Sequence, residues 1–318
     1  MRVLVFGAGV IGTIYGYAWA QAGAAVTHYV RPSRRTDFER GIQLRLLDGR
    51  SPRPREIVDQ YRPRVVDVLT RQDDYDFYIV CVRHYQVDSV LPVLQAGLGN
   101  GDVVFFTGNW AGFRSIEQAL PRERYLWGFP VAGGGYRADG VLDGALLREI
   151  HLGEVDGQLR PRVQQLSDLC QRAGLTVDVQ ENIRHWLWVH FAINSGVIGA
   201  AAKAGGAAQL LGSLPRLRDA ILAGRDALSV CAARGVDVRA FRDAAAFAQP
   251  AWVGALAVWF LMKRDKAARK IMETHTALDD LKAIYRDVLH TADELGLAVP
   301  HYRALNPYLA AFRPVAAV

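Results

Sequence analysis

Three glycines near the start of the chain have the spacing of a phosphate-binding loop. Gly7, Gly9 and Gly12 follow the apolar run at 3–6 in the pattern G-x-G-x-x-G. In such a loop the first glycine permits a tight turn, the second lets the backbone approach a pyrophosphate, and the third lets a helix pack close to the strand. The motif therefore predicts a turn that binds the phosphates of a dinucleotide.

The residues around the glycines supply the context that this motif needs. Val10 and Ile11 open a helical pattern, so their backbone N–H groups would face the phosphates at the positive end of the helix dipole. A second apolar run at 24–30 lies at the distance expected of a β-α-β unit. The alternative is a glycine-rich turn between strand and helix that binds no ligand.

The segment after the second apolar run indicates which dinucleotide binds. An NAD site usually places Asp or Glu about 20 residues past the glycines, where it holds the ribose hydroxyls. Here the segment 27–35 contains no carboxylate, and it contains Arg31, Arg34 and Arg35. A carboxylate would repel a 2′-phosphate, whereas Arg can bind it through two hydrogen bonds. The sequence predicts NADP(H) rather than NAD(H), with Arg31 as the first candidate and Ser33, Arg34 and Arg35 as helpers. A solvated basic loop is the alternative.

A second group of polar residues lies in the long helical pattern at 182–202. His190 and Asn194 are four residues apart, so they share one face of the helix. A single His in an apolar helix is more often a core residue than a catalyst. With an Asn one turn away, however, His190 is a candidate proton donor.

The elements that would position these residues change character midway along the chain. Alternating strand and helix patterns in the first half predict a mainly parallel sheet with helices on both faces, and the second half is helical throughout. We therefore predict an α/β protein with an N-terminal Rossmann domain at 1–180 and an all-α domain at 181–318. The predicted strands are 2–6, 24–30, 64–68, 77–82, 102–106, 125–129, 149–153 and 175–179. The predicted helices are 10–22, 86–96, 112–120, 159–173, 182–202, 215–234, 239–247, 251–262 and 265–296.

Ligands of such sheets bind at the carboxyl ends of the strands. Arg83 follows the predicted strand at 77–82, and Asn109 follows the strand at 102–106. Both residues are therefore candidates for the cofactor site.

Composition excludes several classes of function. The 318 residues carry a net charge of +6, with the excess as scattered Arg rather than basic runs interleaved with aromatics, so nucleic acid is not an expected partner. The charge suits a small anionic or carbonyl substrate beside an anionic cofactor. Three isolated cysteines show no metal-ligand spacing, so no metal site is expected, and they suggest a reducing compartment.

The remaining features concern location and assembly. The chain opens on its first predicted strand, so we expect no signal peptide and a cytoplasmic protein. The apolar stretch 244–262 contains Gln249, Pro250 and Gly254, so a buried helix is expected rather than a membrane span. Apolar faces around 251–262 favour a homodimer.

The motifs together resemble the ketopantoate reductase (2-dehydropantoate 2-reductase) family, whose C-terminal domain is similar to that of 6-phosphogluconate dehydrogenase. The segments that carry this resemblance are VLVFGAGVIGTIYG, VRHYQVDSVL, FFTGNWAGFRSIEQAL, NIRHWLWVHFAINSGV and DELGLAVPHYRAL. The resemblance implies that NADPH delivers hydride to a 2-oxo acid while a general acid protonates the oxygen. It also implies that Asn109 helps to hold the nicotinamide and substrate, and that Arg83 takes the place of a Lys near the cofactor phosphate.

The chain departs from the family where the substrate would bind. The family's proton-donating Lys is replaced by His190, and its second Asn is replaced by Ile198, whereas Asn194 keeps the first. Counting back from the end of the motif puts the family's substrate-binding Glu at Asp280, beside Asp279. Either carboxylate could orient and charge the imidazole of His190.

Three functions follow from this resemblance and its departures. The first is an NADPH-dependent reductase of a 2-oxo acid or related carbonyl compound. The second is an NADPH-dependent reductase of an imine or another ketone, since the related opine-type dehydrogenases are similar in using His and Asp. The third is a protein that binds NADP(H) without catalysis. A His acid should lose rate near neutral pH, whereas a Lys would act at higher pH.

Overall fold

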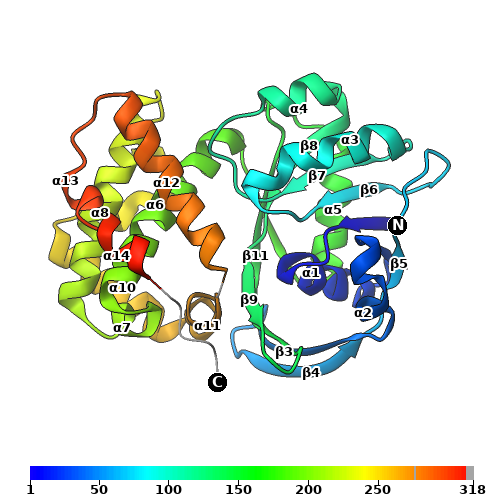
Figure 1. The fold of residues 1–318 in the computed structure, drawn as a ribbon, viewed down its shortest axis with the longest axis horizontal. Coiled ribbons are helices and arrows are strands. Elements are labelled where there is room, and N and C mark those ends of the chain that lie inside the picture. Colours follow the sequence, from blue (N-terminus) through cyan, green and yellow to red (C-terminus); the bar gives the residue numbers. More distant parts are fainter. Residues whose placement is uncertain (276, 313–318) are drawn as a thin grey trace. The chain divides into compact units, whose positions relative to one another are not determined.

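The computed structural model describes residues 1–275 and 277–312, and the chain divides into two compact units. The first unit contains residues 1–108 and 112–183, and the second contains 109–111 and the chain from 184 onward. The first is a mixed α/β unit and the second is helical, which confirms the predicted fold class (Figure 1).

The first unit is built on an eight-stranded sheet in the described part of the chain. All neighbouring strands run parallel except β8 and β11, which are antiparallel. The strand order across the sheet is β12 (Thr176–Val179), β11 (Glu149–Gly153), β8 (Tyr125–Phe129), β7 (Asp102–Phe106), β6 (Phe77–Val80), β1 (Arg2–Phe6), β2 (Ala25–Tyr29) and β5 (Arg64–Val66). The central strands are wholly buried because helices cover both faces, as the nearly continuous apolar runs predict.

Helices lie on both faces of this sheet. α3 (Val87–Gly97) and α4 (Arg114–Ala119) lie on one face, and α1 (Val10–Gln21) and α5 (Pro161–Arg172) lie on the other (Figure 1). The short helix α2 (Arg35–Glu39) follows β2. The predicted helices of this half are correct to within about two residues at each end, apart from α2, which was not predicted.

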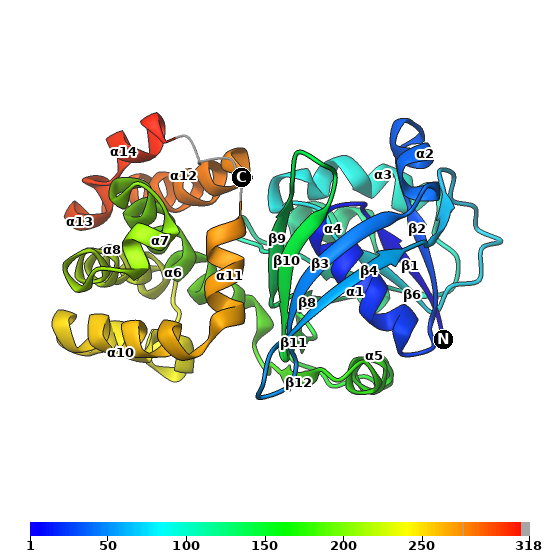
Figure 2. The same ribbon diagram turned by 90° about the horizontal axis from the view of Figure 1, so that it is seen from below.

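A second sheet in the first unit was not predicted from the sequence. Its strand order is β4 (Arg55–Tyr61), β3 (Ile42–Gly49), β10 (Leu142–Leu147) and β9 (Ala132–Tyr136) (Figure 2). Leucines of β3 and β10 pack in the same core as α1, so this helix has a sheet on each side.

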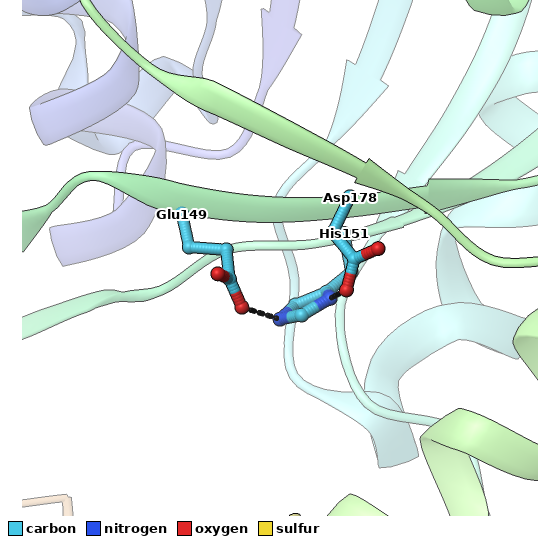
Figure 3. Close-up of side chains that lie close together, drawn as sticks. All are labelled: Glu149, His151 and Asp178. Carbon is cyan, nitrogen blue, oxygen red and sulfur yellow. Dashed lines mark ion pairs between the residues drawn. The ribbon is translucent and has the colours of Figure 1, made fainter. Parts of the chain in front are cut away.

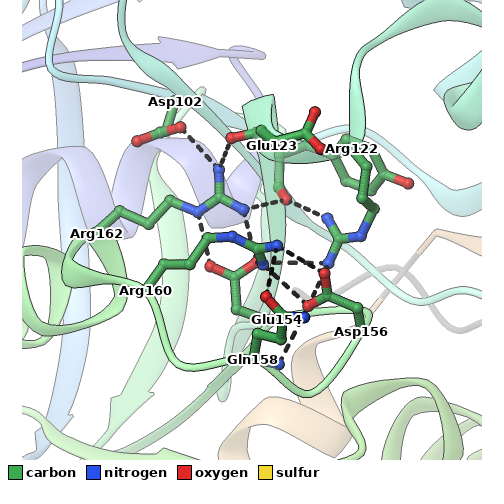
Figure 4. Close-up of polar contacts among 9 residues, drawn as sticks. Asp102, Arg122, Glu123, Glu154, Asp156, Gln158, Arg160 and Arg162 are labelled. Carbon is green, nitrogen blue, oxygen red and sulfur yellow. Dashed lines mark hydrogen bonds and ion pairs between the residues drawn. The ribbon is translucent and has the colours of Figure 1, made fainter.

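A buried ionic network ties α5 to the ends of the main sheet (Figure 4). Arg162 donates to Glu154 at 2.7 and 2.6 Å and to Asp102 at 2.9 Å. Arg160 bridges Glu154 and Asp156. Glu154 is only 2% exposed, so its charge is compensated by the guanidinium groups around it.

The second unit is a helical bundle with its own apolar core. Its helices are α6 (Ile183–Ala204), α7 (Ala207–Leu211), α8 (Leu214–Ala233), α9 (Ala245–Ala248), α10 (Ala251–Arg264), α11 (Lys266–Thr274), α12 (Leu278–Glu294), α13 (Pro300–Arg303) and α14 (Asn306–Ala311). α8 packs against α10, α12 and α13, and the backbones of α6 and α8 approach closely where Gly196 meets Gly224.

Two helix predictions in this half are wrong. The segment 239–247 forms two short 3₁₀ turns followed by α9 instead of one helix. The predicted helix 265–296 is two helices, because α11 ends at Thr274 and α12 begins at Leu278. Asp279 and Asp280 lie in the first turn of α12, where negative charge stabilises a helix N-terminus, and this explains the new start.

Candidate functional site

The three glycines of the N-terminal motif are held in two different ways. Gly7 adopts a φ of +124°, and a Cβ there would collide with the Cys81 carbonyl. A Cβ on Gly12 would meet the Gly7 carbonyl and the side chain of Val5. Packing therefore requires both of these glycines, because β1, β6 and α1 approach closely at this turn.

Gly9 differs from its neighbours because nothing in the described chain crowds it. A Cβ on Gly9 would meet no heavy atom within 4 Å. Gly9 is also the N-cap residue of α1, and no side chain caps the helix there. The backbone N–H groups that begin with Val10 and Ile11 therefore stand at an uncapped helix N-terminus beside open space, which is the arrangement that binds anions.

The basic segment after β2 forms a short 3₁₀ turn at Pro32–Arg34, followed by α2. Arg35 donates to Glu39 at 2.8 Å and to Asp67 at 2.7 Å, so two neighbouring carboxylates already compensate its charge. Arg34 lies 3.2 Å from the carboxylate of Asp37. Arg31 is exposed, and within residues 1–275 and 277–312 no carboxylate pairs with it. Arg31 is therefore the guanidinium best available to a phosphate.

Arg83 and Asn109 follow β6 and β7, as the sequence predicts. Arg83 is the N-cap of a short 3₁₀ turn, its backbone N–H donates to the Gln86 side chain, and its guanidinium donates to the Tyr85 hydroxyl at 2.7 Å. Asn109 is buried at 7% exposure and groups with the helical unit.

His190 is held by two neighbours within the helical unit. Its ring stacks on Trp186 with centroids 4.8 Å apart and planes 15° apart. Its Nδ1 atom lies 3.7 Å from Oδ2 of Asp243. Asn194 follows one turn later on α6 and is half-buried. A carboxylate at Nδ1 can orient the imidazole, as a candidate proton donor requires.

The carboxylate that the structure pairs with His190 was not predicted from the sequence. Asp243 lies in a 3₁₀ turn before α9, inside a segment that the sequence suggested was a regular helix. Asp280 lies 3.7 Å from Nε2 of His275, at the start of α12. The proposed pairing of His190 with Asp279 or Asp280 stays a prediction. No signal in the sequence distinguishes Asp243 from other acidic residues, because its position depends on how the 239–248 segment turns.

Another His–carboxylate group lies on β11 and on β12, the strand at the edge of the main sheet (Figure 3). His151 is paired across strands with Asp178, whose carboxylate lies 3.2 Å from Nδ1, and Glu149 lies 3.5 Å from Nε2. The three ligand atoms lie within 4.8 Å of one another, so these residue types could hold a metal ion. The carboxylates lie at opposite nitrogens of the ring, however, and this arrangement suits a protonated imidazole that donates to both.

The described residues contain no helix that is long and apolar enough to span a membrane. Cys81, Cys170 and Cys231 are free and buried, and burial raises the pKa of Cys170 and Cys231 to about 12.

Comparison with known proteins identifies relatives of this chain. Residues 3–157 match the family described as ketopantoate reductase PanE/ApbA. A 2-dehydropantoate 2-reductase of Pyrococcus abyssi is 22% identical over 200 residues, and the alignment spans only 62% of this chain and 62% of that enzyme.

Solved structures with the same fold cover nearly the whole chain. A D-mandelate dehydrogenase solved with NADH and anilino(oxo)acetate superposes with a TM-score of 0.75 at 15% identity, over 98% of this chain and 97% of the other. A dimeric ketopantoate reductase from Staphylococcus aureus superposes with a TM-score of 0.63 at 16% identity, over 98% of each chain. At these identities the similarity establishes the fold.

Proposed function

We propose that this chain, whose residues 3–157 match the ketopantoate reductase family, is an NADPH-dependent reductase of a 2-oxo acid or a related carbonyl compound. The observation that carries the proposal is the open space at Gly9, which lies at an uncapped helix N-terminus between two glycines that packing requires. A turn that needed glycine only for folding would crowd all three positions. The residues at this turn therefore fit the pyrophosphate of a dinucleotide.

The other cofactor contacts are proposed from the arrangement of charge. Arg31 is available for a 2′-phosphate, with Arg34 beside it, and this favours NADPH. Arg83 and Asn109 would hold the nicotinamide side. The D-mandelate dehydrogenase that shares this fold was solved with NADH, so NADH is the alternative cofactor.

The chemistry divides between the cofactor and the helical unit. The bound nicotinamide supplies a hydride to the carbonyl carbon. His190 would donate the proton to the oxygen, with Asp243 holding its Nδ1 side and Trp186 fixing the plane of its ring. Asn194, one turn away, would hydrogen-bond the substrate, and we retain Asp280 as a candidate for its polar end.

One observation favours a second function. A His–carboxylate pair in place of the family's Lys is what an imine-reducing, opine-type enzyme would use, and His190 with Asp243 is such a pair. In both cases we propose a cytoplasmic homodimer that acts on a small anionic or carbonyl substrate.

The deciding experiment is an assay of NADPH oxidation, with NADH as control, against ketopantoate, aryl and alkyl 2-oxo acids, and the same acids with amines. Turnover of a 2-oxo acid alone would support the first function, and turnover only in the presence of an amine would support the second. Binding of NADPH without any turnover would mean a non-catalytic protein, and no binding would reject the proposal.

Substitution of Gly9 tests the cofactor loop directly. Because a Cβ there meets nothing in the protein, Gly9→Val is expected to fold with an unchanged melting temperature and yet to block the approach of the pyrophosphate. We expect the affinity for NADPH to fall at least tenfold, measured by nicotinamide fluorescence. Gly12→Val is the contrasting control, since it should destabilise the fold itself. Unchanged affinity in Gly9→Val would contradict the loop assignment.

A further inference from the structure

The loop that carries Asn109 is fastened to the helical unit through the next residue, Trp110. The Trp110 ring is 4% exposed and stacks on Phe191 of α6, with centroids 5.4 Å apart and planes 20° apart. Its indole N–H donates to the Thr291 hydroxyl of α12 at 2.8 Å. These contacts explain why residues 109–111 group with the helices rather than with the sheet that precedes them.

Arg234, the C-cap residue of α8, contacts both the ring and the backbone of Trp110. Its guanidinium carbon lies 4.5 Å from the centroid of Trp110 and 3.4 Å from that of Trp188. Its Nη2 atom donates to the Trp110 carbonyl at 2.9 Å. One planar cation therefore contacts two indoles and also donates a hydrogen bond to a backbone carbonyl. A Lys ammonium cannot make all of these contacts in the same geometry.

The electrostatic setting of Arg234 is unusual for a structural arginine. Among residues 1–275 and 277–312 no carboxylate pairs with it, and its Nη1 atom is buried without a hydrogen-bond partner. Burial accordingly lowers the pKa of this guanidinium. An uncompensated cation in a half-buried position costs stability, and packing alone would be served by an apolar side chain.

The same loop is also held on its other side. The indole N–H of Trp127, a fully buried residue of β8, donates to the Thr107 carbonyl at 2.7 Å. Along the chain, Asn109 therefore follows Thr107, which is held within the first unit, and precedes Trp110, which is held within the helical unit.

We propose that Arg234 is a positioning residue that fixes Asn109, through the ring and carbonyl of Trp110, in the orientation needed to hold the nicotinamide and the substrate. The proposal rests on the proposed function, because the role of Asn109 comes from it. A shift of about 1 Å in a reacting group is enough to cost a large factor in rate. Loss of Arg234 should therefore lower turnover although this residue touches neither cofactor nor substrate.

The test is a double-mutant cycle between Arg234 and Asn109. We expect Arg234→Met to lower kcat about tenfold, with a smaller effect on the KM for NADPH, and Arg234→Lys to recover part of the loss. If Arg234 acts through Asn109, the double variant Arg234→Met, Asn109→Ala should be no slower than Asn109→Ala alone. Losses that multiply would overturn the proposal.

Arg216 supplies the control. It also lies on α8 and donates to a backbone carbonyl, that of Gln209, but it is not part of the Trp110 cluster. Arg216→Met should leave kcat unchanged. An equal loss of kcat in Arg216→Met and Arg234→Met would reduce Arg234 to a general structural role.

A spectroscopic measurement separates this proposal from the proposed function. The ¹⁵N-indole resonance of Trp110, assigned with Trp110→Phe, and the side-chain amide of Asn109, assigned with Asn109→Ala, should both shift in Arg234→Met and stay unchanged in Arg216→Met. If the wild-type protein turns over no substrate, the proposed function fails, and these resonances still decide whether Arg234 positions Asn109. Unshifted resonances would overturn the positioning role.

Discussion

In the proposed mechanism the chemistry depends most on His190, the residue that aligns with the proton-donating Lys of the family that the chain resembles. Its Nδ1 atom is paired with Asp243 and its ring is stacked on Trp186, so its orientation is fixed. We expect His190→Ala to lower kcat by about 10²- to 10⁴-fold, the usual contribution of a general acid, and to leave NADPH affinity unchanged. His301→Ala, at an exposed His of α13, is the control. Unchanged turnover in His190→Ala would exclude it from catalysis.

The identity of the acid also predicts a pH dependence. Histidine changes its charge near neutral pH and lysine does so far above it. The wild-type kcat should therefore decline as the pH rises past neutral, whereas His190→Lys should keep its activity to higher pH. The same profile for both variants would mean that another group donates the proton.

We expect Arg31 to decide the choice of cofactor. A bidentate pair with a phosphate contributes roughly 1.5–3 kcal/mol, so Arg31→Ala should weaken NADPH roughly tenfold to a hundredfold. NADH has no 2′-phosphate and should bind as before. Arg35→Ala is the matched control, because Glu39 and Asp67 already bind that guanidinium. Titration of nicotinamide fluorescence measures each affinity. An equal loss of affinity for NADPH and NADH would contradict the assignment of Arg31 to the 2′-phosphate.

At the scale of elements, the sequence predicts the strands of the main sheet well, because their buried residues are largely apolar. β1, β7, β8 and β11 have their predicted bounds, and the fully buried β6 ends two residues before its predicted end. The strands of the second sheet differ in how far their sequences reveal them. β3 alternates buried and exposed residues, which is a strand signal. β4 is mostly exposed and β9 reads AGGGY, so neither has the apolar alternation that indicates a strand.

The unpredicted sheet is linked to the main sheet through His28 of β2. His28 is fully buried, its Nε2 atom lies 3.1 Å from the Tyr61 hydroxyl of β4, and it packs against Gly16 of α1. Burial lowers the pKa of His28 to about 4, whereas the pKa of a histidine in the unfolded chain is about 6.5. Between these two pH values the ring is neutral in the folded protein and protonated in the unfolded chain. The unfolded state then binds more protons, and stability is lost as the pH falls from about 6.5 towards 4.

This linkage gives a prediction for acid stability. Between pH 7 and pH 5, His28 should cost the wild-type protein about 2 kcal/mol of unfolding free energy. His28→Gln is less stable at pH 7 but lacks this loss, so the difference between the two proteins should shrink by that amount at pH 5. Urea denaturation at the two pH values measures it, and a difference independent of pH would show that His28 titrates normally in the folded protein.

At the scale of the whole molecule, the sequence predicted what local spacing determines and missed what tertiary structure determines. The glycine turn needs only a strand, three glycines and a helix, so its position and the roles of Gly7 and Gly12 follow from the motif. Asp243 and Arg234 lie far along the chain from the residues that they contact. Their partners depend on how 3₁₀ turns and helix ends pack, and no periodicity in one sequence records that.

Assembly is the last property that the sequence suggested, and the structure offers a surface for it on α10. One side of this helix exposes large apolar side chains, namely Trp252, Val253, Leu256, Phe260 and Leu261. Arg218 lies over the ring of Trp252 and Lys263 over that of Trp259, so cations border the apolar stripe as polar groups border a protein interface. We expect a second copy of the chain to cover this stripe.

The expectation is tested by mass in solution. The wild-type protein should sediment as a dimer at micromolar concentration, and Leu256→Asp with Phe260→Asp should sediment as a monomer, because two charges would be buried without partners at the interface. Leu295→Asp, at an isolated exposed apolar residue after α12, should remain dimeric. A monomeric wild-type protein would reject the dimer. A dimer that persists in the double variant would place the interface elsewhere, since an apolar stripe this exposed cannot tolerate two buried carboxylates and remain the contact surface.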